Sequence, residues 1–273
     1  MPLPPADLDY VRKLVFDHSG IVLERSKAYL VETRLTPVAT RLGFKSLEEF
    51  VRNLKNTPVN GAHRTVIDAM TTNETYFFRD IHPFEALRKN VLPEIIQNRE
   101  STRTLRIWCG ACSTGQEPYS ISIILKDGFP KIDNWNIQIV ATDLSQDVLE
   151  KAKSGAYTQL EVNRGLPAMY LVKYFKQQQD RWVIREDIRK RVQFRELNLT
   201  KPFPPMGRFD IVFLRNVLIY FDNPTKQQIL GRIQSLLAPD GYLFLGCAET
   251  PVNLNPNFEA VSFGKATCYR LKR

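Results

Sequence analysis

The chain has 273 residues, a formal net charge of +9 and a hydrophobic fraction of 43%. That length holds one large domain or two modest ones, and that composition excludes wholesale disorder. No run of 18 apolar residues occurs and the first residues do not resemble a signal peptide, so a cytoplasmic protein without membrane insertion is expected. The excess of cations predicts an acidic partner: a nucleic acid, an anionic membrane or an acidic protein.

The first seventy residues predict a small helical domain. Apolar residues recur with helical spacing in three segments, namely residues 7–18, 25–42 and 62–71. Ser46 and Glu49 form a capping box that begins another helix between the last two segments. Pro37 falls inside the second segment, where it should kink the helix or begin a second turn. We therefore expect a separate helical domain over residues 1–70.

A basic stripe runs along the second helical segment. Lys27, Arg34 and Arg41 recur every seven residues, apart from the apolar positions of that segment. A run of charges at such spacing is usually a solvated helix face, but it is also the kind of surface that docks an acidic partner. The spacing alone does not decide between these two interpretations.

Residues 104–120 predict the first strand, turn and helix of a nucleotide-binding sheet. A short apolar strand ends at Trp108, small residues follow from Gly110 to Gly115, and an apolar helical pattern begins at Tyr119. The small residues let the backbone approach a ligand closely, and the helix start offers unpaired N–H groups. The glycine spacing matches neither the dinucleotide fingerprint nor a phosphate-binding loop.

Two acidic residues indicate what this turn binds. Glu117 lies inside the turn, where it would repel a pyrophosphate but attract a cation, and S-adenosylmethionine carries both an ammonium and a sulfonium. Asp143 follows a second strand, residues 137–141, at the position where a pair of ribose hydroxyls is bound. The bare pattern therefore predicts a Rossmann-like methyltransferase sheet.

The other segments complete an α/β domain over residues 83–273. Residues 71–82 predict a linker that Phe77 and Phe78 anchor on a core, and a helix follows over 83–98. Two strands at 182–184 and 192–194 are expected to pair with each other, as a small antiparallel β-subdomain inserted at 176–197. Further helices are predicted at 166–175 and 224–237, and further strands at 209–214, 242–245, 258–263 and 266–271, with a turn at 239–241.

Cys109 and Cys112 form a C-x-x-C pair, which raises a redox or zinc interpretation. A zinc site needs two more ligands, and neither the other two cysteines nor the three histidines lie at ligand spacing. We therefore expect small, partly buried thiols that could be sensitive to oxidants, and no metal site.

Four motifs make the prediction more specific. They are residues 108–120 (WCGACSTGQEPYS), 71–79 (TTNETYFFR), 141–143 (ATD) and 214–221 (LRNVLIYF). In sequence and order they resemble the CheR family, the chemotaxis receptor glutamate methyltransferases, and the resemblance covers nearly the whole chain. It implies a class I methyltransferase sheet that uses S-adenosylmethionine, an all-helical N-terminal domain that docks the receptor, and a small antiparallel β-subdomain.

The resemblance also implies roles for individual residues. It implies cofactor contacts for Asn73, Thr75, Arg79, Glu117, Asp143, Asn198, Leu199, Asn216 and Val217. Arg79 and Tyr220 would act at the acceptor carboxylate, a glutamate of the receptor, and the product would be a methyl ester. Lys27, Arg34 and Arg41 would face the acidic methylation helices in the cytoplasmic part of the chemoreceptor.

Two departures limit what the resemblance implies. Family members that bind a pentapeptide tether carry a glycine in a loop of the β-subdomain, but residues 176–181 (KQQQDR) contain none, so we expect tether-independent docking. Many members read G-H-S-E where this chain has Gly246-Cys247-Ala248-Glu249, so no role for that histidine or serine carries over. We expect a monomer without a nucleic-acid partner. Two alternatives stay open: an inactive cofactor-binding adaptor, and a methyltransferase acting on RNA or a small molecule.

Overall fold

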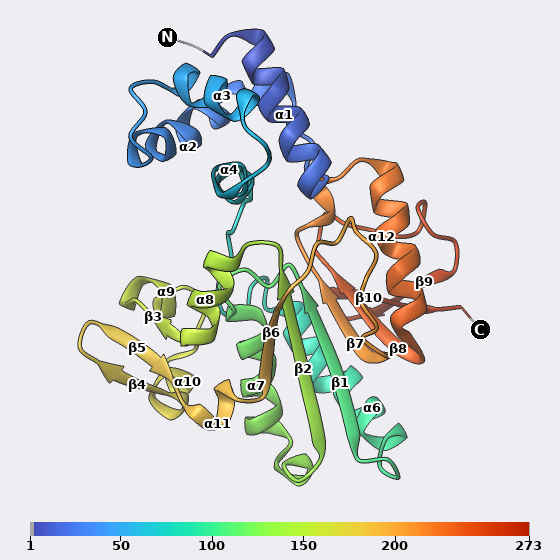
Figure 1. The fold of residues 1–273 in the computed structure, drawn as a ribbon. Coiled ribbons are helices and arrows are strands. Elements are labelled where there is room, and N and C mark those ends of the chain that lie inside the picture. The colour runs from blue at the N-terminus through green and yellow to red at the C-terminus, as the bar shows by residue number, and fades with distance from the viewer. Residues whose placement is uncertain (1–2, 273) are drawn as a thin grey trace. The chain divides into compact units, whose positions relative to one another are not determined.

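The computed structural model describes residues 3–272, which divide into two compact units. One unit extends to Thr72 and includes the short segment Tyr220–Thr225. The other comprises Asn73–Ile219 and the chain from Lys226 onward. Figure 1 shows the course of the chain through both.

The first unit is built from helices around its own apolar core. They are α1 (Pro5–Ser19), the short 3-10 helix η1 (Arg25–Lys27), α2 (Ala28–Arg41), α3 (Leu47–Asn56) and α4 (Gly61–Met70). The core includes Val11, Val15, Leu35 and Phe50, all fully buried. The Ser46 hydroxyl accepts a hydrogen bond from the Glu49 N–H at 3.1 Å, which confirms the predicted cap of α3. Helix α2 runs through Pro37, so of the two outcomes expected at this proline, a kink or the start of a second turn, the second does not occur.

The second unit contains a seven-stranded sheet in the order β6-β2-β1-β7-β8-β10-β9 (Figure 1). Its strands are β1 (Thr104–Gly110), β2 (Asn136–Asp143), β6 (Val192–Glu196), β7 (Phe209–Leu214), β8 (Leu237–Leu245), β9 (Phe258–Phe263) and β10 (Ala266–Leu271). The first five strands of this order, namely β6, β2, β1, β7 and β8, pair in parallel. Strand β10 is antiparallel to both β8 and β9. This is the predicted Rossmann-like sheet, in which the parallel strands end at one edge.

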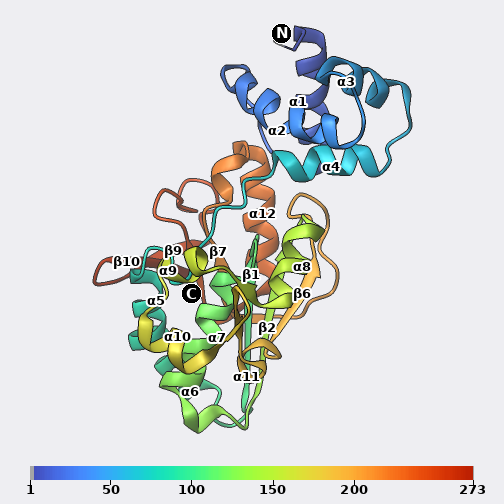
Figure 2. The same cartoon turned by 90° about the vertical axis from the view of Figure 1, so that its left-hand side faces the viewer.

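Helices connect and cover these strands. They are α5 (His82–Ala86), the π-helical turn η2 (Leu87–Val91), α6 (Leu92–Asn98), α7 (Gln116–Gly128), the 3-10 helix η3 (Pro130–Ile132), α8 (Gln146–Ser154), α9 (Gln159–Asn163), α10 (Ala168–Tyr174), α11 (Glu186–Arg189), the 3-10 helix η4 (Leu218–Tyr220) and α12 (Asn223–Leu236). Helix α7 packs against β2 and β6, as Figure 2 shows. Among the described residues, no helix is both long and apolar enough to cross a membrane.

The small antiparallel sheet differs from its prediction. Its strands are β3 (Ala156–Tyr157), β5 (Arg181–Ile184) and β4 (Phe175–Gln178), in that order. The expected pairing of 182–184 with 192–194 is wrong, because β6 instead lies parallel to β2 at the edge of the large sheet. There Val192 is buried, and the Phe194 ring lies 5.6 Å from the Tyr119 ring of α7. Burial of these side chains against α7 explains why the segment joins the large sheet.

A second correction concerns β8. A turn was expected at 239–241, but the strand runs through these residues, with a shift of register opposite Phe209 and Ile211. At Gly241 an added Cβ would lie 2.8 Å from the Asp210 carbonyl oxygen. The glycine therefore serves close packing of neighbouring strands rather than chain reversal.

Candidate active site

The loop between β1 and α7 is held in an unusual backbone conformation. Ala111, Ser113 and Gly115 have φ angles of 54°, 49° and 92°, in the left-handed region that only glycine adopts easily. At Gly110 an added Cβ would lie 2.7 Å from Cδ1 of Leu214. Strain of this kind persists where the surroundings fix the backbone, and it is concentrated at functional sites.

Asp143 fixes this loop from the end of β2. Its side-chain oxygen Oδ2 accepts a hydrogen bond from the Ser113 N–H at 2.8 Å, and Oδ1 accepts one from the Ser145 N–H at 3.1 Å. Burial raises the pKa of this carboxyl, and the hydrogen bonds from the Ser145 and Ser113 backbone act against that rise. A buried acceptor is thus held in one orientation at the carboxyl edge of the sheet.

Glu117, in the first turn of α7, has a partner that was not predicted. Its Oε2 accepts a hydrogen bond from Nη1 of Arg215 at 3.0 Å, and the Arg215 side chain is only 1% exposed. Burial raises the pKa of Glu117, whereas the positive charges of Arg215 and Arg79 oppose that rise. Inside the protein the charge of Glu117 is therefore opposed by that of the buried Arg215.

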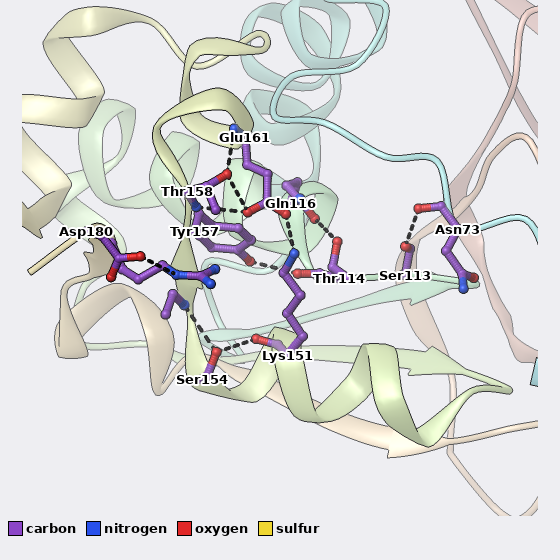
Figure 3. Close-up of polar contacts among 12 residues, drawn as sticks. Asn73, Ser113, Thr114, Gln116, Lys151, Ser154, Tyr157, Thr158, Glu161 and Asp180 are labelled. Carbon is purple, nitrogen blue, oxygen red and sulfur yellow. Dashed lines mark hydrogen bonds and ion pairs between the residues drawn. The ribbon is translucent and has the colours of Figure 1, made fainter. Parts of the chain in front are cut away.

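The segment following Thr72 carries Asn73, Thr75 and Arg79 to the same loop. The Ser113 hydroxyl donates to the Asn73 carbonyl at 2.9 Å, and Nη1 of Arg79 donates to the Glu74 carbonyl at 2.6 Å. Figure 3 shows the Asn73–Ser113 contact together with the polar network of α8 and α9. A cavity of about 370 Å³ opens here, and its lining includes Asn73, Thr75, Thr114, Gln116 and Lys151.

Asn216 and Val217 follow β7 and are positioned by Glu249. The Glu249 carboxylate accepts from the N–H groups of Asn216 at 2.8 Å, Gly246 at 2.7 Å and Ile219 at 3.3 Å. Asn216 has a φ of 58°, another left-handed non-glycine residue. Its Oδ1 atom is buried and has no hydrogen-bond partner in the structure. A buried amide oxygen without a partner is costly, and a bound ligand would satisfy it. Through these contacts Glu249 holds the backbone that follows β7.

Asn198 and Leu199 follow β6, the edge strand beside β2. Oδ1 of Asn198 accepts from the Thr200 N–H at 2.9 Å, and the Leu199 carbonyl accepts from Nη1 of Arg232 at 2.7 Å. The Leu197 N–H donates to the Asp143 carbonyl at 2.9 Å, which ties this segment to the end of β2. Residues that are predicted to contact the cofactor and that lie far apart in the sequence, such as Asp143, Asn198 and Asn216, are therefore found at the same edge of the sheet.

Some predicted residues lie in the helical unit. Tyr220 ends η4 and belongs to that unit, where its carbonyl accepts from the Val22 N–H at 2.9 Å. Lys27 and Arg41 are exposed at the two ends of α2. Arg34 is half-buried, and its Nη1 donates to the carbonyls of Met70 and Thr71 at 3.1 and 3.0 Å. Arg34 therefore caps the end of α4, a role that its spacing in sequence does not reveal.

Three of the four cysteines are buried: Cys109, Cys112 and Cys268. Burial raises the pKa of both Cys109 and Cys112 well above the ordinary value, so they stay protonated and unreactive. Cys247 is exposed and lines a second cavity of about 430 Å³. Within residues 3–272, no group of three or more His, Cys, Asp or Glu side chains could hold a metal ion.

These features fit S-adenosylmethionine. Glu117 offers a negative charge to an ammonium, Asp143 offers fixed acceptor oxygens to ribose hydroxyls, and the Asn216 amide oxygen awaits a donor. The strand order and this set of acceptor groups define a Rossmann-like methyltransferase that depends on S-adenosylmethionine.

Comparison with known proteins identifies the family. Residues 73–267 match the SAM-binding domain of CheR methyltransferase, and residues 6–71 match its all-alpha domain. The chain therefore belongs to the CheR methyltransferase family, as the motifs predicted. It is 45% identical to chemotaxis protein methyltransferase 1 of Pseudomonas aeruginosa, over 98% of each chain. It is 44% identical to the chemotaxis protein methyltransferase Cher2 of Pseudomonas putida, over 97% of this chain and 98% of that one. These findings establish S-adenosylmethionine as the cofactor and methylation in chemotaxis as the activity.

Proposed function

We propose that this protein transfers the methyl group of S-adenosylmethionine to glutamate carboxylates of chemoreceptor cytoplasmic helices, which become methyl esters. The observation that carries the proposal is the contact made by Arg215, whose Nη1 donates to Oε2 of Glu117 at 3.0 Å and whose Nη2 donates to the Arg79 carbonyl at 2.9 Å, so that the turn bearing Arg79 lies beside the buried Glu117. A cation at this place can orient an incoming carboxylate with its forked N–H donors.

An acceptor carboxylate needs no general base, because it is ionised near neutral pH with a reference pKa of about 4.3. Each of the three histidines has a hydrogen-bond partner in the structure. The ring of His63 is buried in the helical unit, His18 contacts the Leu14 carbonyl, and His82 pairs with Glu85. Chemistry that needs proton removal, as on many hydroxyl or amine acceptors, has less support from these residues.

Placement of the two reactants is then the main task of the protein. When bound, S-adenosylmethionine supplies an electrophilic methyl group. Glu117 would hold the ammonium, Asp143 the ribose, and the segments around Asn73, Asn198 and Asn216 would complete the binding site. Arg79 and Tyr220 would orient the acceptor carboxylate. Orientation of two reactants lowers an activation barrier by roughly 7–11 kcal/mol in favourable cases.

Receptor docking is proposed to use the helical unit alone. Lys27 and Arg41 would attract an acidic receptor helix, and Arg34 would contribute charge while it caps α4. The turn between β4 and β5 supports tether-independent docking, because it contains only Gln179 and Asp180 and no glycine. Gln179 already takes a left-handed φ of 54° to close this turn. A monomer in the cytoplasm, where the methylated receptor helices lie, completes the proposal.

Transfer of tritiated methyl groups tests the acceptor. We expect label in purified receptor cytoplasmic fragments, released as methanol by mild base, and none in RNA. A receptor fragment whose methylation-site glutamates are changed to alanine provides the control and should stay unlabelled. Base-stable label, or label in RNA, would replace the glutamate assignment with another acceptor. Cofactor binding without any transfer would favour the adaptor alternative.

A further inference from the structure

Arg215 joins three separate segments at the carboxyl end of β7. Its side chain is 1% exposed. Nη1 donates to Oε2 of Glu117 at 3.0 Å, whereas Nη2 donates to the Arg79 carbonyl at 2.9 Å and to Oδ2 of Asp80 at 2.7 Å. One guanidinium therefore contacts helix α7 on one side and the turn containing Arg79 on the other.

The turn that Arg215 contacts is strained. Phe78, Asp80 and Ile81 have φ angles of 52°, 66° and 39°, although none is glycine. Residues hold such angles only where their surroundings over-determine the backbone. The Phe78 N–H donates to the Ser120 hydroxyl at 3.0 Å, and the Phe78 ring stacks on Tyr170 at 5.5 Å. After Phe78, the next two residues of the turn are held by Nη2 of Arg215, which donates to the Arg79 carbonyl and to the Asp80 carboxylate.

Arg79 lies between these fixed points. Its carbonyl is bound by Arg215, and its own guanidinium reaches back to the Glu74 carbonyl. The direction of the Arg79 side chain thus depends on a backbone conformation that is unfavourable without outside support.

We infer that Arg215 is a positioning residue: it holds the strained turn so that Arg79 faces the acceptor carboxylate, while it balances the charge of Glu117. The inference rests on the proposed function, because it takes Arg79 as the group that meets the acceptor. The fork of Arg215 suits both tasks, since its two terminal nitrogens serve different segments.

A second arginine, half-buried with 19% of its side chain exposed, also joins two separate segments through carboxylates. Arg99 lies near the amino end of β7, where its Nε donates to Oδ1 of Asp210 at 2.8 Å and its Nη2 to Oδ1 of Asp240 at 2.6 Å. It joins the same kinds of group with similar geometry, but at the edge of the sheet opposite the site residues. Arg99 therefore provides a matched control for Arg215.

Replacement by lysine separates the two tasks of Arg215. Arg215→Lys keeps a positive charge beside Glu117, but one ammonium on a flexible stem cannot reproduce the fork. We expect kcat to fall about 100-fold, as for displaced catalytic groups, while the Kd for S-adenosylhomocysteine changes by less than about threefold. Amide hydrogen exchange at residues 78–82 should become about tenfold faster. Arg99→Lys should lower the melting temperature and leave kcat and the exchange of residues 78–82 near their normal values.

Two results would overturn the inference. One is unchanged exchange at residues 78–82 in Arg215→Lys, which would mean that the turn does not need the arginine. The other is a loss of kcat in both lysine variants in proportion to their loss of melting temperature, which would make Arg215 merely structural.

A second variant covers the case in which Arg215→Lys does not fold. Asp80→Asn removes the charge from one contact of the turn at a side chain that is 33% exposed. It should shift kcat and exchange in the same direction but by less, and normal values for both would count against the inference. Amide exchange and S-adenosylhomocysteine binding require no methyl acceptor. If wild-type protein labels no receptor fragment, the proposed function fails, yet the exchange data still decide the role of Arg215.

Discussion

Substitution of Asp143 by alanine should affect cofactor binding and stability together. The residue Asp143 is 7% exposed, and its carboxylate accepts hydrogen bonds from the N–H groups of Ser113 and Ser145. Asp143→Ala removes both acceptors, so two buried donors lose their partner at the loop between β1 and α7. It also removes the oxygens proposed to bind the ribose hydroxyls.

The magnitude follows from these contacts. A buried donor without a partner costs about 1–3 kcal/mol. Because water can reach the space left by the carboxylate and satisfy part of this loss, the two donors together should lower the free energy of unfolding by about 2–4 kcal/mol. For a chain of this size that corresponds to a melting temperature lower by roughly 4–16 °C. Hydrogen bonds from the ribose to a charged acceptor contribute about 1.5–3 kcal/mol, so the Kd for cofactor should rise about tenfold or more.

Calorimetry measures both quantities on the same sample. Titration with S-adenosylhomocysteine, well below the melting temperature, gives the affinity, and a thermal scan gives the stability. Asp210→Ala is the control, because this buried carboxylate accepts bonds from Arg99 and from the Arg106 N–H at the amino end of β7. It should lose similar stability and keep its affinity. Equal affinities of Asp143→Ala and the wild type would remove Asp143 from the binding site and refute this account.

Three further predictions concern the acceptor, the receptor and pH. Arg79→Ala should cut kcat about 100-fold and change cofactor affinity little, so near-normal methylation of a receptor fragment would exclude it from catalysis. Charge reversal of Lys27 and Arg41 to glutamate should raise the KM for receptor and weaken its salt dependence; a normal KM would make them solvated side chains. Arg34 is a poorer test, because its reversal also breaks the cap of α4. Burial raises the pKa of Glu117 above its ordinary value of 4.5, so on acidification this carboxylate becomes protonated before the pH reaches 4.5. Cofactor affinity should fall as it is protonated. Glu117→Gln should weaken this pH dependence in calorimetric titrations.

Much of the sheet could be predicted because its strands carry local signals. The strand Phe209–Leu214 is buried at every residue, and the final two strands have the bounds that were predicted. The strand at 192–196 was recognised but assigned to the wrong partner. Its pairing with β2 is made across about fifty residues of chain, and short-range periodicity carries no information about such contacts.

The site residues followed from motifs, whereas their partners did not. Glu117 and Asp143 were predicted as site residues from their places beside a turn and at the end of a strand. Arg215 was overlooked as a functional residue, although a charged residue directly after the apolar run Ile211–Leu214 already signals the need for a buried counter-charge. Glu117 and Asp80 supply that charge from distant positions, and only the fold shows that they meet.

The unequal exposure of the cysteines offers a practical handle on this protein. Thiols react with alkylating reagents as thiolates, and burial raises the pKa of Cys109, Cys112 and Cys268 while it also hides them from reagents. Cys247 is exposed in a cavity whose lining includes Asp80 and Glu249. A fluorophore or spin label added to the native sequence should therefore attach at Cys247. It would report on the neighbourhood of the Arg79 turn without an engineered attachment point.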